Sequence, residues 1–236
     1  MRVVLVSLAR RGGMVHFLAE VAGALSQLTD TAVVTSSLAD LSYLPRAVAR
    51  IQVDTGKHSL GSIARYLNPL TWYRLARQLQ GLHASLVHIV GVHEWNPALA
   101  LLCRLVQQPI VYTVHDPTPH PGAPWAIRIS DWLTIRLADK VVALTRHGRR
   151  QLLLRGIHPN RIVVIPHPMY SLFLRWRTAD LQRSKMILCL GRLEAYKNLQ
   201  TLVLAFASVR ERLKGWSLTI AGSGALPPFL LQRHGQ

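Results

Sequence analysis

Residues 187–198 of the chain read ILCLGRLEAYKN, and this stretch decides the fold that we expect. An apolar run predicts a buried strand that stops at Gly191, and Arg192 and Lys197 follow in a loop. Asn198 is the expected N-cap of a helix, because apolar residues recur at helical spacing after it. They are Leu199, Leu202, Val203, Phe206, Val209 and Leu213. Strand, basic loop and helix N-terminus in that order predict a phosphate site, with a plain solvated turn as the alternative.

The segment GRLEAYKN, followed by TLVLAFA at 201–207, resembles the donor-binding loop of the family 4 glycosyltransferases, which have the two-domain GT-B fold. The resemblance implies that Arg192 and Lys197 hold the diphosphate of a nucleotide sugar. Their charge would stabilise the leaving diphosphate without a metal or a cofactor, and the sequence contains no Asp-x-Asp pair. Gly222 and Gly224 follow the strand expected at 217–221 and are candidate residues of the donor loop.

The N-terminus reads as a β-α-β unit with paired glycines, Gly12 and Gly13, after the first strand. Glycines allow a backbone to approach a ligand closely. The G-x-G-x-x-G fingerprint is absent, which counts against an NAD-dependent enzyme. In the resembling family a Gly-Gly loop at this place faces the cleft and helps to bind donor or acceptor. A tight turn without a ligand is the alternative.

A second candidate loop, HDPTPHPG, starts at His115 directly after the strand expected at 109–114. Histidine titrates near neutrality and can exchange protons or bond a sugar hydroxyl. The loop resembles one in family 4 N-terminal domains, which implies that His115 lies beside the sugar, with Asp116 as its orienting neighbour or a turn residue. A structural His115 is one alternative. A metal site is another, formed by His115 and His120 with His88 and His93, but no recognised zinc spacing is present.

Short apolar runs alternate with helical segments as far as residue 168, which predicts a doubly wound parallel sheet. Strands are expected at 2–7, 31–35, 51–54, 86–90, 109–114, 140–144 and 161–165, helices at 14–28, 69–81, 96–106, 125–137 and 146–155, and a mobile loop at 57–61. The segment from VVALTRH at 141–147 to IVVIPHP at 162–168 also resembles the end of the family's N-terminal domain.

These resemblances imply an α/β chain of GT-B type. We expect a complete N-terminal, acceptor-side Rossmann-like domain over 1–168, a linker over 169–184 and an incomplete donor-binding domain over 185–236. Two strands and one helix are expected after the linker, whereas a Rossmann-like domain has about five or six strands. We therefore expect a truncated chain or a fragment, whose second segment is flexible or leans on the first, or a half that relies on a complementary chain or oligomer.

The charge balance favours an anionic partner, because 28 Lys+Arg stand against 11 Asp+Glu and give a formal net charge of +17. Nucleic acid is disfavoured, since no recognition helix or aromatic-interleaved sheet is evident. Arginines cluster over 146–155, after Arg136 and Lys140, and suit an anionic membrane surface or a solvated helix face.

No apolar run reaches the ~18 residues of a membrane span. Cys103 and Cys189 lie in apolar runs, as buried free thiols do. We expect a cytoplasmic protein, with a peripheral place at the inner face of the membrane as an alternative.

The predicted function is transfer of a sugar from a nucleotide-diphosphate donor to a hydroxyl acceptor, either a glycan or a lipid-linked molecule. One alternative is a catalytically inactive remnant that serves as a binding or partner domain. The other is a nucleotide-sugar epimerase of the same fold, which the GRLEAYKN loop fits less well. The present chain alone is expected to be inactive.

Overall fold

The structure is a computed structural model that describes residues 1–118, 124–177 and 184–224. The chain divides into two compact units, Met1–Trp176 and Arg177–Gln236. The division falls within the stretch predicted as a linker, and each unit is described by itself.

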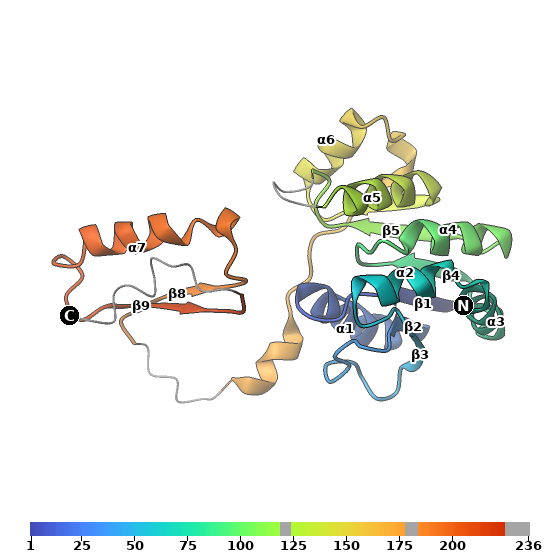
Figure 1. The fold of residues 1–236 in the computed structure, drawn as a ribbon, viewed down its shortest axis with the longest axis horizontal. Coiled ribbons are helices and arrows are strands. Elements are labelled where there is room, and N and C mark those ends of the chain that lie inside the picture. The colour runs from blue at the N-terminus through green and yellow to red at the C-terminus, as the bar shows by residue number, and fades with distance from the viewer. Residues whose placement is uncertain (119–123, 178–183, 225–236) are drawn as a thin grey trace. The chain divides into compact units, whose positions relative to one another are not determined.

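Unit 1 is a doubly wound α/β domain (Figure 1). Its seven strands are all parallel, as predicted, and they stand in the order β3-β2-β1-β4-β5-β6-β7. In this order the chain reverses its direction across the sheet between β1 and β4, as in a Rossmann-like domain. The strands are β1 (Arg2–Ser7), β2 (Asp30–Ser36), β3 (Ala49–Val53), β4 (Leu86–Ile89), β5 (Ile110–Val114), β6 (Lys140–Ala143) and β7 (Ile162–Val164). The helices are α1 (Gly13–Ser26), α2 (Ser59–Leu67), α3 (Pro69–Gly81), α4 (Asn96–Leu105), α5 (Trp125–Leu137) and α6 (Arg146–Leu154), with 3-10 turns η1 (Pro159–Arg161) and η2 (Ser171–Trp176).

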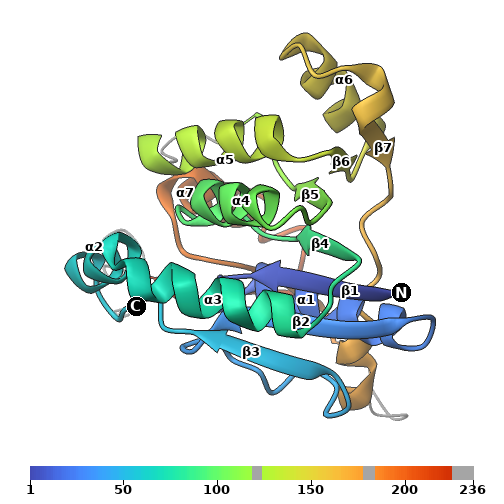
Figure 2. The ribbon, with the colours of Figure 1, turned by 90° about the vertical axis from the view of Figure 1, so that its right-hand side faces the viewer.

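Both faces of this sheet are covered, because alternate residues of each strand point to opposite sides. Val4 and Val6 of β1 face a core built with α3, α4, α5 and α6, whereas Val3 and Leu5 face α1. Figure 2 shows α3, α4 and α5 beside the strands of this sheet. Fully buried strands explain why the sequence shows continuous apolar runs rather than alternation.

The prediction of a mobile loop over 57–61 was wrong, because α2 begins at Ser59. Tyr66 of this helix packs edge-on against Trp72 and Trp95, with ring centroids 5.6 and 5.8 Å apart. Asn68 ends α2 and caps α3, since its side chain accepts a hydrogen bond from the backbone N–H of Leu70 at 2.9 Å. Contacts with distant aromatic rings therefore stabilise a helix that the local pattern did not reveal.

The first half of the predicted linker is part of unit 1. Tyr170 and Leu172 pack against the α1 side of the core. Glu20 of α1 accepts hydrogen bonds from the hydroxyl of Ser171 and from the backbone N–H of Leu172, the latter at 3.1 Å. The 3-10 turn η2 is thereby tied to α1.

Unit 2, in its described part, contains β8 (Met186–Leu190), the 3-10 turn η3 (Ala195–Lys197), α7 (Leu199–Ser208) and β9 (Ser217–Ala221). The two strands pair in parallel. Leu188 and Leu190 remain 52% and 75% exposed, so one face of β8 lacks the cover that a Rossmann-like sheet has. This unit is an incomplete Rossmann-like domain, as predicted. The helix is shorter than expected, because it ends at Ser208 and excludes Val209 and Leu213.

Within the described ranges, no helix is both long and apolar enough to cross a membrane. Both cysteines are free, as expected. Cys103 is buried, and that burial raises the pKa of its thiol to about 12. Cys189 is half-buried, so the prediction of a buried thiol was wrong for this residue.

Candidate functional site

The candidate site of unit 1 lies at the carboxyl edge of the sheet, where the strand order reverses between β1 and β4. Ligands of open α/β sheets bind at such a switch point. Gly12 and Gly13 follow β1 here, and both are exposed. Gly12 has a φ of 79°, which favours glycine, and a Cβ atom at either position would meet nothing within 4 Å. The space above these two glycines is open to a ligand.

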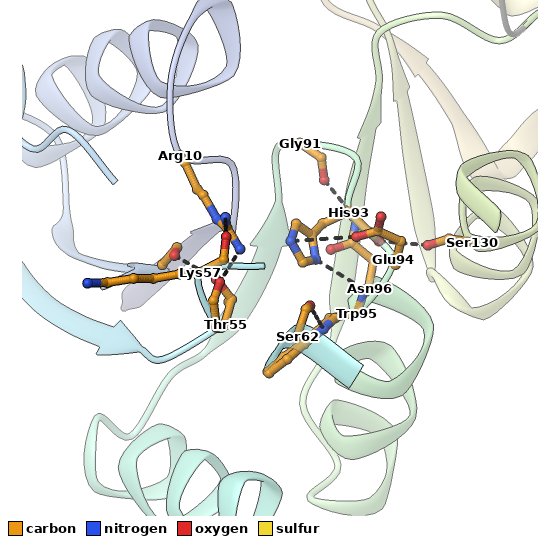
Figure 3. A network of polar contacts seen from close by, with 12 residues as sticks. Arg10, Thr55, Lys57, Ser62, Gly91, His93, Glu94, Trp95, Asn96 and Ser130 are labelled. Carbon is orange, nitrogen blue, oxygen red and sulfur yellow. Dashed lines mark hydrogen bonds and ion pairs between the residues drawn. The ribbon is translucent and has the colours of Figure 1, made fainter. Parts of the chain in front are cut away.

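The loop after β4 is held by hydrogen bonds at both ends (Figure 3). The side-chain amide of Asn96 donates to the carbonyl of Gly91 at 2.7 Å, and the Ser130 hydroxyl donates to the carbonyl of His93 at 2.7 Å. The backbone N–H of Trp95 donates to Nδ1 of His93 at 3.2 Å. This last bond fixes the imidazole, whose Nε2 atom lies 3.8 Å from Oε2 of Glu94.

His93 and Glu94 offer complementary chemistry. Burial lowers the pKa of His93; Glu94 opposes this effect, whereas the charge of Arg10 adds to it. Because Nδ1 accepts a hydrogen bond, the neutral imidazole carries its proton on Nε2 and is a donor toward the cavity. Glu94 is 56% exposed and is an acceptor. A hydroxyl that donates to Glu94 and accepts from His93 would satisfy both.

A polar cavity of about 370 Å³ lies beside these two residues. Its lining consists of Leu8, Ala9, Arg10, Lys57, His58, Ser62, His93 and Glu94. The Arg10 guanidinium donates to the carbonyls of Gly56 and Lys57, the latter at 2.9 Å, and so joins the loops after β1 and β3. The Lys57 side chain extends away from His93 (Figure 3), so the fixed positive charge near the imidazole comes from Arg10.

His115 lies at the carboxyl end of β5 and is half-buried. Its Nε2 atom is 2.9 Å from the carbonyl of Val90, to which it donates. The ring stacks edge-on against Phe17 at 4.7 Å and lies 6.3 Å from the ring of His167. Burial lowers the pKa of His115, and the exposed Asp116 opposes this through its charge. The imidazole is therefore neutral near pH 7.

A network of buried hydrogen bonds and one ion pair holds the loop that carries His115 and Asp116. The Tyr112 hydroxyl donates to Asp131 at 2.8 Å, and Nη1 of Arg155 lies 3.5 Å from the same carboxylate. Arg155 also donates to the carbonyl of Pro117 at 2.7 Å. Burial raises the pKa of Asp131, and its two partners lower it. Arg155 thus links a buried charge to the position of the His115 loop.

The histidines considered as metal ligands do not form a cluster in the described ranges, where no group of three His, Cys, Asp or Glu is arranged to hold a metal. His88 bonds Thr113 instead, with Nε2 2.8 Å from the hydroxyl, and burial lowers its pKa to about 4. His120 lies outside the described residues.

In unit 2, Arg192 and Lys197 lie in the loop that follows β8, as predicted from their order. Arg192 forms an ion pair with Glu194 at 2.6 Å. The Lys197 ammonium lies 5.1 Å from the centre of the Tyr196 ring, and its Cε atom would be 3.9 Å from a Cβ at Gly191. Both cations therefore stand at the carboxyl end of β8.

Asn198 occupies the N-cap position of α7, but its predicted capping bond is wrong. The residue is left-handed, with φ 51° and ψ 42°, and its side chain caps no N–H of the helix. Its Oδ1 atom accepts from the hydroxyl of Thr201 at 2.9 Å instead. The first N–H groups of α7 are thus not used by this side chain.

Gly222 and Gly224 lie against the Arg192 loop. The loops after β8 and β9 continue the parallel pairing, since Leu193 donates its N–H to the carbonyl of Ser223 at 2.9 Å. A Cβ atom at Gly222 would lie 1.7 Å from the carbonyl oxygen of Gly191. One at Gly224 would lie 2.9 Å from that of Leu193. These glycines are required for the close approach of the two loops.

From the sequence, His93 was a candidate only as a metal ligand, and Glu94 was not predicted as a functional residue. The sequence did contain a signal for this pair. His93 and Glu94 follow the short apolar run of β4, and in a doubly wound sheet this strand lies beside β1. The hydrogen bond from the Trp95 N–H to Nδ1 of His93 and the nearby charge of Arg10 depend on the folded loops.

Residues 11–169 match the model of the family described as Glycosyltransferase Family 4. Among solved structures, the UDP-GlcNAc 2-epimerase from Methanocaldococcus jannaschii is similar with a TM-score of 0.67 at 15% identity, covering 94% of this chain and 65% of that one. The Neisseria meningitidis UDP-GlcNAc 2-epimerase bound to UDP-GlcNAc is similar with a TM-score of 0.67 at 18% identity. The match covers 94% of this chain and 66% of that one. Anabaena Alr3699/HepE in complex with UDP and glucose is similar with a TM-score of 0.66 at 16% identity. The match covers 95% of this chain and 61% of that one.

These structural similarities establish the fold. The chain spans 61% to 66% of the length of the three structures. No curated protein matches the sequence significantly.

Proposed function

Since the chain belongs to glycosyltransferase family 4, we propose that it serves in the transfer of a sugar from a nucleotide-diphosphate donor to a hydroxyl acceptor. The observation that carries this proposal is the pair of cations, Arg192 and Lys197, at the carboxyl end of β8. Solved structures of the same fold that contain UDP or UDP-GlcNAc support a nucleotide sugar as the ligand.

On the donor side, Arg192 and Lys197 would bind the diphosphate and stabilise its charge as it leaves. The N-terminus of α7 would add backbone N–H groups, which the Asn198 side chain does not use. Gly222 and Gly224 would keep the loop after β9 close enough to hold Arg192 in place. The activated bond belongs to the donor substrate, so this role needs no resident cofactor.

On the acceptor side, Glu94 would accept the proton of the attacking hydroxyl while Nε2 of His93 orients its oxygen. His115 and Asp116 would contact the sugar, and Gly12 and Gly13 would admit a ligand close to the backbone. The bound proton of His93 suits it to donate a hydrogen bond, whereas the exposed carboxylate of Glu94 suits it to act as the base.

Calorimetric titration of the chain with UDP tests the donor role. Arg192→Ala should weaken UDP binding at least tenfold, because it removes a charged bidentate contact. Arg210→Ala is the matched control, since Arg210 is an exposed arginine of the same unit. Equal affinities of wild type and Arg192→Ala, or equal losses in both variants, would refute the assignment.

A nucleotide-sugar epimerase is the second candidate, because two of the similar structures are UDP-GlcNAc 2-epimerases. An epimerase converts the donor without an acceptor. Proton NMR of UDP-GlcNAc incubated with the protein in deuterium oxide separates the two, since epimerisation through loss of a C–H proton introduces deuterium into the sugar. UDP binding without turnover under either condition would favour a binding domain.

A further inference from the structure

We propose that unit 1 binds an acceptor with an apolar chain, whose hydroxyl-bearing head lies at His93 and Glu94 and whose chain lies in a neighbouring apolar hollow. The inference deepens the acceptor side of the proposed function and rests on it. Two adjoining cavities of different chemistry carry the argument.

The apolar hollow has a volume of about 570 Å³ and lies between α2, α4 and α5. Its lining consists of Ser62, Ile63, Tyr66, Glu94, Trp95, Pro97, Trp125, Ala126, Ile129, Ser130 and Leu133. Trp125, Ile63 and Ile129 are 75%, 54% and 49% exposed. A cluster of exposed large apolar side chains around one hollow is typical of a surface that a ligand or partner covers.

Three polar side chains of this lining are hydrogen-bonded within the protein. Nε1 of Trp95 donates to the hydroxyl of Ser62 at 3.2 Å, and the hydroxyl of Ser130 donates to the carbonyl of His93. The walls therefore offer carbon surface to an occupant, and a hydrocarbon chain there would gain the free energy of leaving water.

The hollow adjoins the polar cavity, because Ser62 and Glu94 line both. Ser62 lies on α2, and Glu94 follows His93 in the loop after β4 (Figure 3). An occupant that reaches both cavities needs a polar head and an apolar chain in one molecule. A plain glycan would leave the hollow open to water, and a bare hydrocarbon would leave His93 and Glu94 without a ligand.

The polar end also favours a particular kind of head. Nε2–H of His93 and the Glu94 carboxylate form a donor–acceptor pair, which suits a hydroxyl. Arg10 adds a positive charge fixed by two backbone carbonyls, so a phosphate next to the hydroxyl would be tolerated. The structure thus selects a lipid-like acceptor over a free glycan.

Alkyl β-glucosides of increasing chain length, below their micelle concentrations, test the proposal by calorimetric titration. The affinity of the wild type should rise with chain length, by up to about fourfold for each methylene buried. Ile129→Asn, which places an amide in the hollow, should reduce this dependence strongly. Leu105→Asn is the control, because Leu105 is 81% exposed on α4 and does not line the hollow.

The head is tested separately. Glu94→Gln should weaken binding of every glucoside by a similar factor and leave the chain-length dependence unchanged. Affinities that do not depend on chain length in the wild type, or equal losses in Ile129→Asn and Leu105→Asn, would overturn the inference. A dimer that Ile129→Asn dissociates would overturn it too, since the hollow would then be an interface between copies.

The two proposals fail in different ways. UDP binding that depends on Arg192, without any effect of chain length, would leave the proposed function standing and remove the apolar acceptor. If the affinity for glucosides rose with chain length but UDP did not bind, the site for an amphiphilic acceptor would stand. The proposal that Arg192 binds the donor diphosphate would then be refuted.

Discussion

Arg192 and Glu194 form an ion pair of 2.6 Å in the loop after β8, so the residue proposed to bind the donor diphosphate already has an anionic partner. Their side chains are 63% and 37% exposed. An exposed pair of this kind contributes little stability, about 0 to 1 kcal/mol, so a diphosphate can replace the carboxylate at low cost. Under the proposed function, Glu194 would compete with the donor diphosphate for Arg192.

Replacing this competitor should strengthen donor binding. Glu194→Gln removes the negative charge and keeps the side-chain volume, so we expect the affinity for UDP to rise by roughly twofold to fivefold. Titrations at low and high ionic strength check the cause, because salt should reduce the gain. Weaker binding by the variant would mean that Glu194 contacts the ligand itself.

Gly222→Ala should disrupt unit 2. The new Cβ atom would lie 1.7 Å from the carbonyl oxygen of Gly191, so the loops after β8 and β9 must separate. We expect the free energy of unfolding of unit 2 to fall by about 1–3 kcal/mol and hydrogen exchange to become faster in β8 and β9. Gly81→Ala is the control, since a Cβ there meets nothing within 4 Å. Unchanged exchange in Gly222→Ala would contradict the observed loop contact.

His88 should make the protein less stable in acid. Burial lowers its pKa from 6.5 to about 4, so between these values the unfolded chain binds a proton that the folded chain does not. Stability then falls as the pH drops from about 6.5 to about 4, by on the order of 3 kcal/mol, and the loss stops below that range.

Urea unfolding of wild type and His88→Gln across this pH range measures the effect. The variant should lose less stability on acidification, and His147→Gln, a change at an exposed histidine of α6, should behave like the wild type. If the stability of all three proteins fell with pH in parallel, the pKa of His88 would be the same in the folded and the unfolded chain.

Arg155→Ala should loosen the His115 loop and destabilise unit 1. It leaves the Asp131 carboxylate, 9% exposed, with the Tyr112 hydroxyl as its remaining described partner, and it frees the carbonyl of Pro117. Removing one partner of a buried ion pair such as Arg155–Asp131 lowers the free energy of unfolding by about 3 kcal/mol. Because Arg155 lowers the pKa of Asp131, its loss raises that pKa, and the cost should shrink as the pH falls and the carboxyl is protonated.

A double-mutant cycle with Asp131→Asn checks this. The double variant should be more stable than the sum of the single losses predicts, since the uncompensated charge is absent. Strict additivity would show that Arg155 acts on the loop independently of Asp131.

Local pattern was sufficient for most of the α/β framework. The apolar runs of β1 and β9 and the helical spacing of α3 and α5 predicted these elements at their observed bounds. The reason is that both faces of a parallel sheet are buried, so its strands appear as continuous apolar runs between amphipathic helices. The order of β8, basic loop and α7 was likewise predictable.

Tertiary contacts decided the rest. The α2 helix forms where its Tyr66 meets Trp72 and Trp95, and η2 joins unit 1 because Glu20 binds its backbone. His93 and Glu94 are brought to the cavity beside Arg10 only by the folded loop after β4. By itself, the sequence determined most of the helices and strands, because hydrophobic periodicity is local. The folded chain decided which polar groups face one another, because those pairings join residues far apart in the sequence.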